Sequence, residues 1–149
     1  YEKIESSQLK KIKNPQVKIS GSDKAPSAVE KAKINIENAN LSEFISLEKK
    51  DFFQIEKQSD APLHLVMNPP YGTRLEGDIN ALYQGIGDAF KQSFTNTQAW
   101  IISANLEALK CVGLRPSRKI KLFNGKLETR FMYYPIYKGT KRIHKLKQN

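Results

Sequence analysis

Short apolar runs that alternate with helix-patterned segments constrain the fold of this sequence more than any other feature. Runs typical of β-strands lie at residues 17–22, 44–47, 63–67 and 99–102. Between them, apolar side chains recur every three or four residues, which predicts one helix opened by Asp23–Pro26 and another from Ile79. Strands that alternate with helices favour an α/β fold with a mostly parallel sheet.

The pattern changes after the last of these runs. Asn105 is placed to cap a short helix that ends at Gly113. Asn124-Gly125 then separates two strand-like segments, Lys119–Phe123 and Lys126–Tyr137. Asn-Gly tolerates the positive φ angles of a type I′ turn, so the segment is predicted to be a β-hairpin. An antiparallel pair is therefore expected to close the parallel sheet.

The charge balance favours polyanionic partners such as nucleic acid. The 149 residues hold 25 Lys and Arg against 15 Asp and Glu, a formal net charge of +10. Residues 138–149 form a basic tail without an acidic side chain, and a second basic cluster comprises Arg115, Arg118, Lys119 and Lys121. A solvated tail with ordinary surface lysines is the alternative interpretation.

Several classes of protein are disfavoured by what the sequence lacks. No apolar run approaches the roughly 18 to 20 residues of a membrane helix, and the start of the chain does not read as a secretory signal. Cys111 is the single cysteine, so neither an internal disulfide framework nor a multi-cysteine metal site is expected. The predicted compartment is the cytoplasm, and the protein is expected to bind neither a membrane nor a metal ion.

The most informative stretch is Leu63–Arg74, LHLVMNPPYGTR. It places Asn68-Pro69-Pro70-Tyr71 at the carboxyl end of a strand, which is where open α/β sheets bind ligands. The two prolines fix φ and hold the preceding residues extended, so the loop is preorganised. Asn68 and the proline carbonyls then offer hydrogen-bond acceptors, and Tyr71 an aromatic face, which together suit an amino group on a planar ring. A stiff turn with a surface tyrosine is the alternative.

Such acceptors can promote chemistry at an exocyclic amine, a poor nucleophile because its lone pair is delocalised into the ring. Accepting both N–H bonds in one geometry favours a pyramidal nitrogen and stabilises the positive charge that develops as the nitrogen attacks a methyl group. The expected catalytic residues are therefore Asn68, Pro69, Pro70 and Tyr71, with Asn68 contributing mainly to rate and Tyr71 mainly to positioning.

The motif resembles the fourth motif, [DNS]-P-P-[YFW], of class I S-adenosylmethionine-dependent methyltransferases that modify amino nitrogens. More narrowly, NPPYGTRLE followed by SRKIKLFNGKLETRF is similar to the bacterial 23S rRNA guanine-N2 methyltransferase family that carries an RNA-binding THUMP domain upstream. The similarity spans about Ser20–Tyr137. It implies a Rossmann-like methyltransferase sheet, with residues 1–137 a partial catalytic domain and residues 138–149 a basic C-terminal tail.

The resemblance also implies a set of cofactor contacts. The family's acidic residue at the end of the second sheet strand, which binds the ribose hydroxyls of S-adenosylmethionine, maps to Asp23. The acidic residue and apolar neighbour beside the adenine map to Asp51 and Phe52, and Asn68 completes the set. Without the resemblance, Asp23 reads as a helix-initiating residue and Asp51 as a turn residue.

The sequence departs from the family by lacking its first strand and glycine-rich loop. The only G-x-G, Gly85–Gly87, lies within a helical pattern and follows no strand. In the family the missing strand lies between those predicted at 17–22 and 63–67, so its removal leaves a gap of about 9 to 10 Å. We therefore expect the first-strand and THUMP segments of a longer protein as partners, and a fragment that is inactive by itself.

The resulting expectation is an rRNA methyltransferase that acts on a guanine exocyclic amine in a flipped or unpaired nucleotide. The candidate RNA contacts are Arg74, Arg118, Lys119 and Lys121, with a solvated strand edge as the alternative for the last three. An adenine-N6 DNA methyltransferase, a glutamine-modifying protein methyltransferase and a truncated nucleic-acid-binding module without activity are the other readings.

Overall fold

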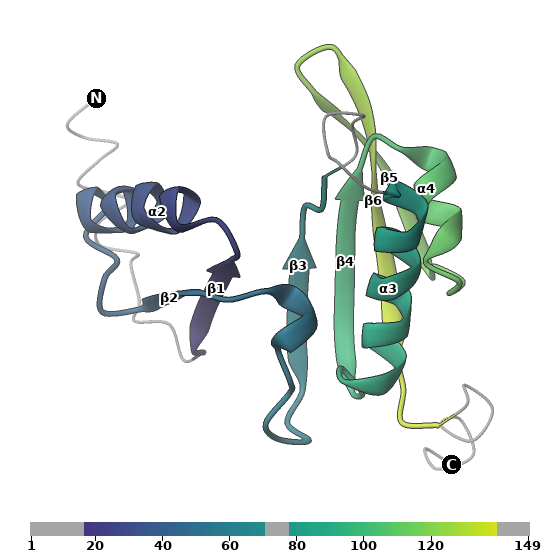
Figure 1. Cartoon of the computed structure of the whole chain (residues 1–149), viewed down its shortest axis with the longest axis horizontal. Helices are drawn as coiled ribbons and strands as arrows, with labels where there is room; N and C mark the ends of the chain where they lie inside the picture. Colours follow the sequence, from purple (N-terminus) through teal and green to yellow (C-terminus); the bar gives the residue numbers. More distant parts are fainter. Residues whose placement is uncertain (1–16, 71–77, 140–149) are drawn as a thin grey trace, which may run out of the picture. The chain divides into compact units, whose positions relative to one another are not determined.

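The computed structural model describes residues 17–70 and 78–139 (Figure 1). Contacts within the chain divide it into two units, Tyr1–Gln54 and Ile55–Asn149. Each unit has its own β-sheet.

The first unit is a strand–helix–strand motif. Its elements are β1 (Ile19–Asp23), α2 (Pro26–Asn38), β2 (Ile45–Lys49) and the short 3-10 helix η1 (Phe52–Gln54). The two strands are parallel, with Ile19 opposite Ile45 and Asp23 opposite Lys49. Proline is well suited to the first position of α2, because a first-turn N–H has no partner within the helix. Val29 is the buried residue of α2.

The second unit contains a mixed four-stranded sheet in the order β3-β4-β6-β5. Its elements are β3 (Leu63–Met67), α3 (Ile79–Gln92), β4 (Thr97–Ser103), α4 (Leu106–Cys111), β5 (Arg118–Asn124) and β6 (Leu127–Ile136). The β3–β4 pair is parallel, whereas β4–β6 and β5–β6 are antiparallel. The α/β class, the α3 helix that contains Gly85–Gly87, and the C-terminal hairpin are thus confirmed.

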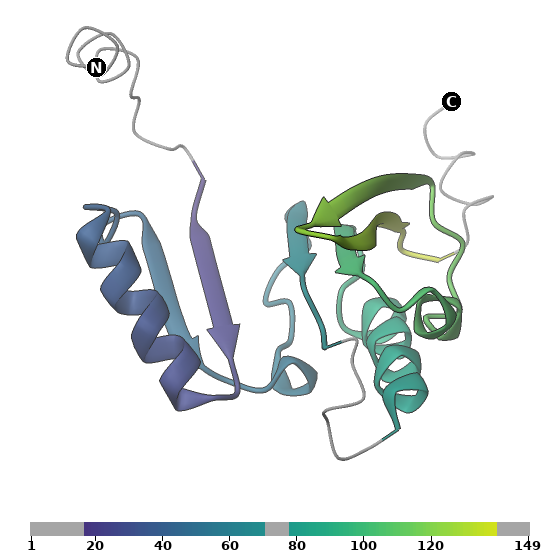
Figure 2. The ribbon, with the colours of Figure 1, turned by 90° about the horizontal axis from the view of Figure 1, so that it is seen from above.

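The core of the second unit lies between one face of its sheet and the two helices α3 and α4 (Figure 2). Tyr83, Ile86 and Phe90 recur along one side of α3 and are almost fully buried, as the sequence spacing predicts. The Phe90 ring lies 6.3 Å from that of Tyr134 on β6. Alternate residues of β4, including Ala99, face the same core, because side chains alternate along a strand.

The hairpin turn differs from the expected type I′ turn. The paired residues Asn124 and Leu127 enclose Gly125 and Lys126, so the turn begins one residue later than predicted. Of these two residues only Gly125 has a positive φ, +61°. A type II′ turn needs a positive φ only at its first central position, where glycine has no steric cost. Asn124 is therefore the last residue of β5.

Four strands, β1, β2, β3 and β5, have an unpaired edge within the described ranges. β1 is hydrogen-bonded to β2 alone and β3 to β4 alone. Each edge presents backbone N–H and C=O groups that another strand could use. None of the helices in residues 17–70 and 78–139 is long and apolar enough to cross a membrane.

Candidate functional site

The candidate catalytic loop begins where β3 ends. Asn68 follows Met67, the last residue of the strand, and its side chain is exposed. Pro69 is buried, whereas its neighbours Asn68 and Pro70 are exposed. The loop therefore packs against the protein through Pro69 and exposes the residue on either side. Tyr71 and Arg74 lie outside the described residues. With φ fixed at both prolines, the backbone that carries the Asn68 amide has little freedom.

The strand register brings a second loop beside this one. Met67 lies opposite Ile101 in the parallel β3–β4 pair, so Asn68 is level with Ile102. Ile102 is the residue before Ser103, where β4 ends. The Ser103 hydroxyl lies 2.6 Å from the Tyr83 hydroxyl, and its oxygen accepts the Asn105 backbone N–H at 3.0 Å. Both hydroxyl-bearing residues are fully buried. This network holds the carboxyl end of β4 rigidly next to Asn68.

Sequence reasoning missed the Tyr83–Ser103 pair. A tyrosine within an otherwise apolar helix face and a serine at the last position of a strand were the available signals. Neither identifies its partner, because 20 residues separate the two in the chain. Their hydrogen bond depends on α3 packing across the sheet.

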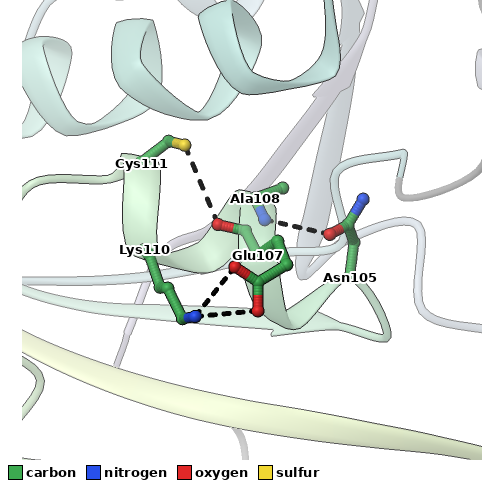
Figure 3. Close-up of polar contacts among 5 residues, drawn as sticks. All are labelled: Asn105, Glu107, Ala108, Lys110 and Cys111. Atoms are coloured by element: carbon green, nitrogen blue, oxygen red, sulfur yellow. Dashed lines mark hydrogen bonds and ion pairs between the residues drawn. The ribbon is translucent and has the colours of Figure 1, made fainter.

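The predicted cap of α4 is confirmed (Figure 3). The Asn105 side-chain oxygen accepts the Ala108 backbone N–H at 2.9 Å. One turn further, Lys110 contacts both Glu107 carboxylate oxygens at 2.8 Å, and the Cys111 thiol points at the Glu107 carbonyl oxygen at 3.7 Å. The short helix that follows the β4 loop is thus fixed at its first turn by a side-chain cap.

The first unit brings the two acidic cofactor candidates to one end of its sheet. Asp23 is the last residue of β1, and its backbone carbonyl accepts the Lys50 N–H at 3.0 Å. Asp51 follows Lys50 directly. Each carboxylate uses Oδ1 to accept a backbone N–H two residues on, from Ala25 at 2.7 Å and from Phe53 at 3.0 Å.

These contacts leave one oxygen of each carboxylate for a ligand. The described residues place no hydrogen bond on Oδ2 of Asp23 or Asp51. Phe52 is half-buried beside them, with its ring 5.4 Å from that of Phe53 in an edge-on arrangement. The unit therefore combines two hydroxyl-accepting carboxylates with an aromatic surface.

The basic candidates Arg118, Lys119 and Lys121 are all exposed and all lie on β5. With β4 and β6 between β5 and β3, they are separated from the Asn68 strand by roughly 14 Å of sheet. Lys121 contacts Glu128 at 2.5 Å and lies over the Phe123 ring, 5.3 Å from its centroid. Arg118 and Lys119 have no ion pair among the described residues.

Glu128 is the acidic exception on this basic hairpin. Hydrogen bonds from Lys121 and then Arg130 hold the pKa of its carboxyl below the ordinary value of 4.5. It therefore stays ionised at neutral pH and offsets part of the local positive charge. At the other end of the unit, Lys138 of the predicted tail contacts Asp60 at 3.3 Å, whereas residues 140–149 lie outside the described ranges.

A shallow depression at the amino end of β4 does not belong to this site. It is lined by Pro62, Gln98, Tyr133 and Pro135, among others. Gln98 lies four residues before Ile102, the residue level with Asn68, so the depression is at the opposite end of the sheet.

Comparison with known proteins agrees with this arrangement. Ribosomal RNA large subunit methyltransferase K/L of Shewanella sp. (strain W3-18-1) is 32% identical over 133 residues, covering 88% of this chain and 19% of the relative. The chain thus spans about a fifth of the length of the curated relatives it matches.

Solved structures share the fold. SMU.472, described as a methyltransferase and complexed with SAH, superimposes with a TM-score of 0.81 at 23% identity, over 93% of this chain and 37% of that one. A structure described as a possible methylase of Clostridium difficile 630 gives 0.80 at 29% identity, with the same coverage. The model of the RMKL-like methyltransferase domain family matches residues 2–132. The chain therefore belongs to the family of RMKL-like methyltransferase domains.

Proposed function

We propose that this chain is part of an enzyme that transfers a methyl group from S-adenosylmethionine to the exocyclic amine of a nucleobase, namely guanine N2 in 23S rRNA. The observation that carries the proposal is the Asn68-Pro69-Pro70 loop at the carboxyl end of β3, beside the rigid end of β4. Membership of a methyltransferase family and curated relatives named as ribosomal RNA methyltransferases support it.

In the proposed mechanism the loop orients the amine. The Asn68 side-chain oxygen accepts one N–H of the base and a proline backbone carbonyl accepts the other. This geometry turns the nitrogen lone pair out of the ring plane and stabilises the positive charge that develops on nitrogen. A nitrogen–carbon bond forms as a sulfur–carbon bond breaks, and the methylated nitrogen then loses a proton to water. No base is needed before attack.

The chemistry of the first unit fits the cofactor. When bound, S-adenosylmethionine supplies an electrophilic methyl group on a sulfonium. In our proposal the free Asp23 oxygen accepts ribose hydroxyl hydrogens, Asp51 accepts a hydrogen bond from the adenosine part, and Phe52 contacts the adenine. Each carboxylate is already oriented by its own Asx turn, so little side-chain entropy is lost on binding.

The proposed RNA contacts follow the hairpin. Arg118 and Lys119 are exposed and unpaired among the described residues, so they are available to phosphates. Lys121 is available only in competition with Glu128. Tyr71 and Arg74 stay predictions, for base stacking and phosphate contact respectively. A basic surface and a single cysteine are consistent with action on RNA in the cytoplasm.

The proposed activity needs segments that these 149 residues do not include. The glycine-rich loop and first strand, expected from the family resemblance, would complete the cofactor site. A THUMP segment would add RNA affinity. The chain covers 19% of its curated relative, which leaves room for both. The edges of β1 and β3 are each unpaired among the described strands, as such a completion requires.

Replacement of Asn68 tests the proposal. In the longer methyltransferase polypeptide that contains this segment, Asn68→Ala should lower kcat for methyl incorporation into unmodified 23S rRNA by about 10²- to 10³-fold, because one charge-stabilising acceptor is lost. The affinity for S-adenosylmethionine, measured by calorimetry, should fall far less than kcat, because Asp23, Asp51 and Phe52 supply the other proposed cofactor contacts. Asn38→Ala, at an exposed amide at the end of α2, is the matched control and should retain full activity.

The same assay separates the alternatives. Labelled methyl groups should enter guanine N2 of rRNA rather than adenine N6 of DNA or a protein glutamine. Salt-sensitive RNA binding without any methyl incorporation would contradict the proposal and indicate a binding module. Equal losses of turnover and cofactor affinity in Asn68→Ala would point to misfolding instead.

A further inference from the structure

The Ser103 hydroxyl joins three elements of the second unit at one point. Ser103 is the last residue of β4, and its hydroxyl is hydrogen-bonded to the Tyr83 hydroxyl of α3 at 2.6 Å. The Ser103 oxygen also accepts the backbone N–H of Asn105, the residue that caps α4. Ser103 and Tyr83 are both fully buried. Removal of either hydroxyl would therefore release a connection between α3 and the end of β4.

This junction lies next to the proposed acceptor loop. Asn68 is level with Ile102, the residue before Ser103, in the parallel β3–β4 pair. Neighbouring strands lie about 4.8 Å apart, so a shift at the end of β4 changes the packing of the first residue after β3. The strand pair and the hydroxyl pair both lie within the second unit, Ile55–Asn149. Their geometry is thus independent of the first unit.

The hydroxyl pair is a polar contact in a largely apolar core. Ile86 and Phe90, further along the same face of α3, are apolar, and a phenylalanine would fill nearly the same volume as Tyr83. A buried hydrogen bond between two neutral hydroxyls adds little net stability, because both groups lose their bonds to water on folding. A satisfied buried network instead specifies one arrangement of the elements that it joins. The pair is therefore better explained by geometry than by stability.

The second buried tyrosine of this core supports the same interpretation. Among the described residues the Tyr134 hydroxyl has no hydrogen-bond partner. Tyr134 lies opposite Ala99, which is further from the Asn68 end of the sheet than Ser103 is. Of the two buried tyrosines, the one that is hydrogen-bonded to the sheet is thus the one beside the acceptor loop.

We propose that Tyr83 and Ser103 are positioning residues for the methyl transfer, because their hydrogen bond fixes the end of β4 against α3 and thereby the place of the Asn68 amide. The inference rests on the proposed function. Both hydroxyls are buried, so they act through Asn68 and do not touch the substrate. Reacting groups must be held within about 0.5 Å of their productive geometry, and a displacement of about 1 Å can cost about 10²-fold in rate.

Kinetics of the longer methyltransferase polypeptide test this role. Tyr83→Phe keeps the ring and should lower kcat about 10-fold, whereas Ser103→Ala removes both hydrogen bonds and should lower it about 10²-fold. The rate is counted per molecule that binds S-adenosylmethionine, because a merely structural role would reduce the number of such molecules and leave the rate of each unchanged. The KM for S-adenosylmethionine should change less than about twofold. Tyr134→Phe is the matched control and should retain the full kcat.

The double variant Tyr83→Phe/Ser103→Ala tests whether the two residues act through one bond. It should turn over no more slowly than Ser103→Ala alone, because the bond between the hydroxyls is already lost in that variant. Losses that multiply would show two independent effects and contradict the proposal. An unchanged kcat of Tyr83→Phe, in a polypeptide that methylates rRNA, would also overturn it and leave the proposed function intact.

Hydrogen exchange followed by mass spectrometry gives a readout that needs no activity. In the same polypeptide without RNA, Tyr83→Phe should speed exchange of the backbone amides in Leu65–Asn68, and Tyr134→Phe should not. Faster exchange at Asn105 alone would mean that the pair acts only on the α4 cap, and equally faster exchange throughout β6 would mean general destabilisation. Either result would refute the positioning role. An unmodified polypeptide that transfers no methyl group would instead contradict the proposed function, and the exchange data would still decide whether Tyr83 positions the Asn68 loop.

Discussion

At the residue scale, Tyr134 combines a buried position with an unused hydroxyl. Its side chain is 1% exposed, and among the described residues its hydroxyl has no hydrogen-bond partner. Burial, and then the neighbouring Tyr83, raise the pKa of Tyr134 to about 12 from the ordinary 10.0. The contrast with Tyr83, whose hydroxyl is hydrogen-bonded to Ser103, shows that the two buried tyrosines contribute differently.

This difference predicts an alkaline loss of stability. The unfolded phenol ionises near pH 10 whereas the folded one holds its proton to about pH 12. The contribution of Tyr134 to stability is thus complete below pH 10 and is lost as the pH rises through 12. Tyr134→Phe should keep the stability at pH 7, or raise it by up to about 1 kcal/mol, because it removes an unpaired buried hydroxyl.

Chemical denaturation at pH 7, 10 and 11.5 measures the effect. The loss between pH 10 and 11.5 should be smaller in Tyr134→Phe than in the unmodified chain. Tyr133→Phe, on the opposite face of the sheet, is the control and should retain the full loss. An identical pH dependence of all three proteins would show that Tyr134 does not carry the effect.

At the element scale, the contact between α3 and α4 depends on one glycine. A Cβ atom at Gly87 would lie 1.8 Å from the Val112 carbonyl oxygen and 2.7 Å from its carbon. These are backbone atoms, so a side-chain rotation cannot relieve the clash. Glycine at this helix position costs about 1 kcal/mol relative to alanine in isolation, and the close approach of the two helices explains why it is there.

Gly87→Ala should therefore destabilise the chain despite its better helix propensity. The expected loss in the free energy of unfolding is about 1–3 kcal/mol, because α4 must shift away from α3. Gln84→Ala, at an exposed position of the same helix, should change it by no more than about 0.5 kcal/mol. Urea denaturation followed by circular dichroism compares the two variants, and equal midpoints would mean that α4 adjusts freely.

At the scale of the whole molecule, the net charge of +10 is consistent with the proposed RNA binding, which should weaken as salt is added. Each phosphate contact releases counterions, so the logarithm of the binding constant should fall linearly with the logarithm of salt concentration. Lys119→Ala should reduce the slope by about 0.7 for a single strand. Lys121→Ala should reduce it less, because Lys121 is already paired with Glu128.

Fluorescence anisotropy with a labelled rRNA fragment at several salt concentrations measures these slopes. The two lysines are matched because both are exposed and lie two residues apart on β5. A slope unchanged by Lys119→Ala would remove this residue from the RNA contacts, and a larger effect of Lys121 would show that its ion pair opens on binding.

Local sequence patterns were sufficient to predict much of the fold. The β3 strand occupies the predicted residues Leu63–Met67, α3 begins at the predicted Ile79, and Asn105 caps α4. Each of these depends on side-chain periodicity or on a cap within a few residues. The hairpin turn was placed one residue too early, because both Asn124 and Gly125 tolerate positive φ and only the pairing of β5 with β6 decides which one adopts it.

The sequence by itself determined the class of fold, the strand-end position of Asn68 and the positive charge, since all three follow from residue types at short spacing. Only the tertiary structure decided that Tyr83 is hydrogen-bonded to Ser103, that Glu128 forms an ion pair with Lys121, and that Trp100 stacks on two aromatic side chains of β6. The Tyr83 and Trp100 contacts join residues 20 or more positions apart, whereas the Lys121–Glu128 pair spans one hairpin. The geometry of all three depends on strand order or register, which no local pattern encodes.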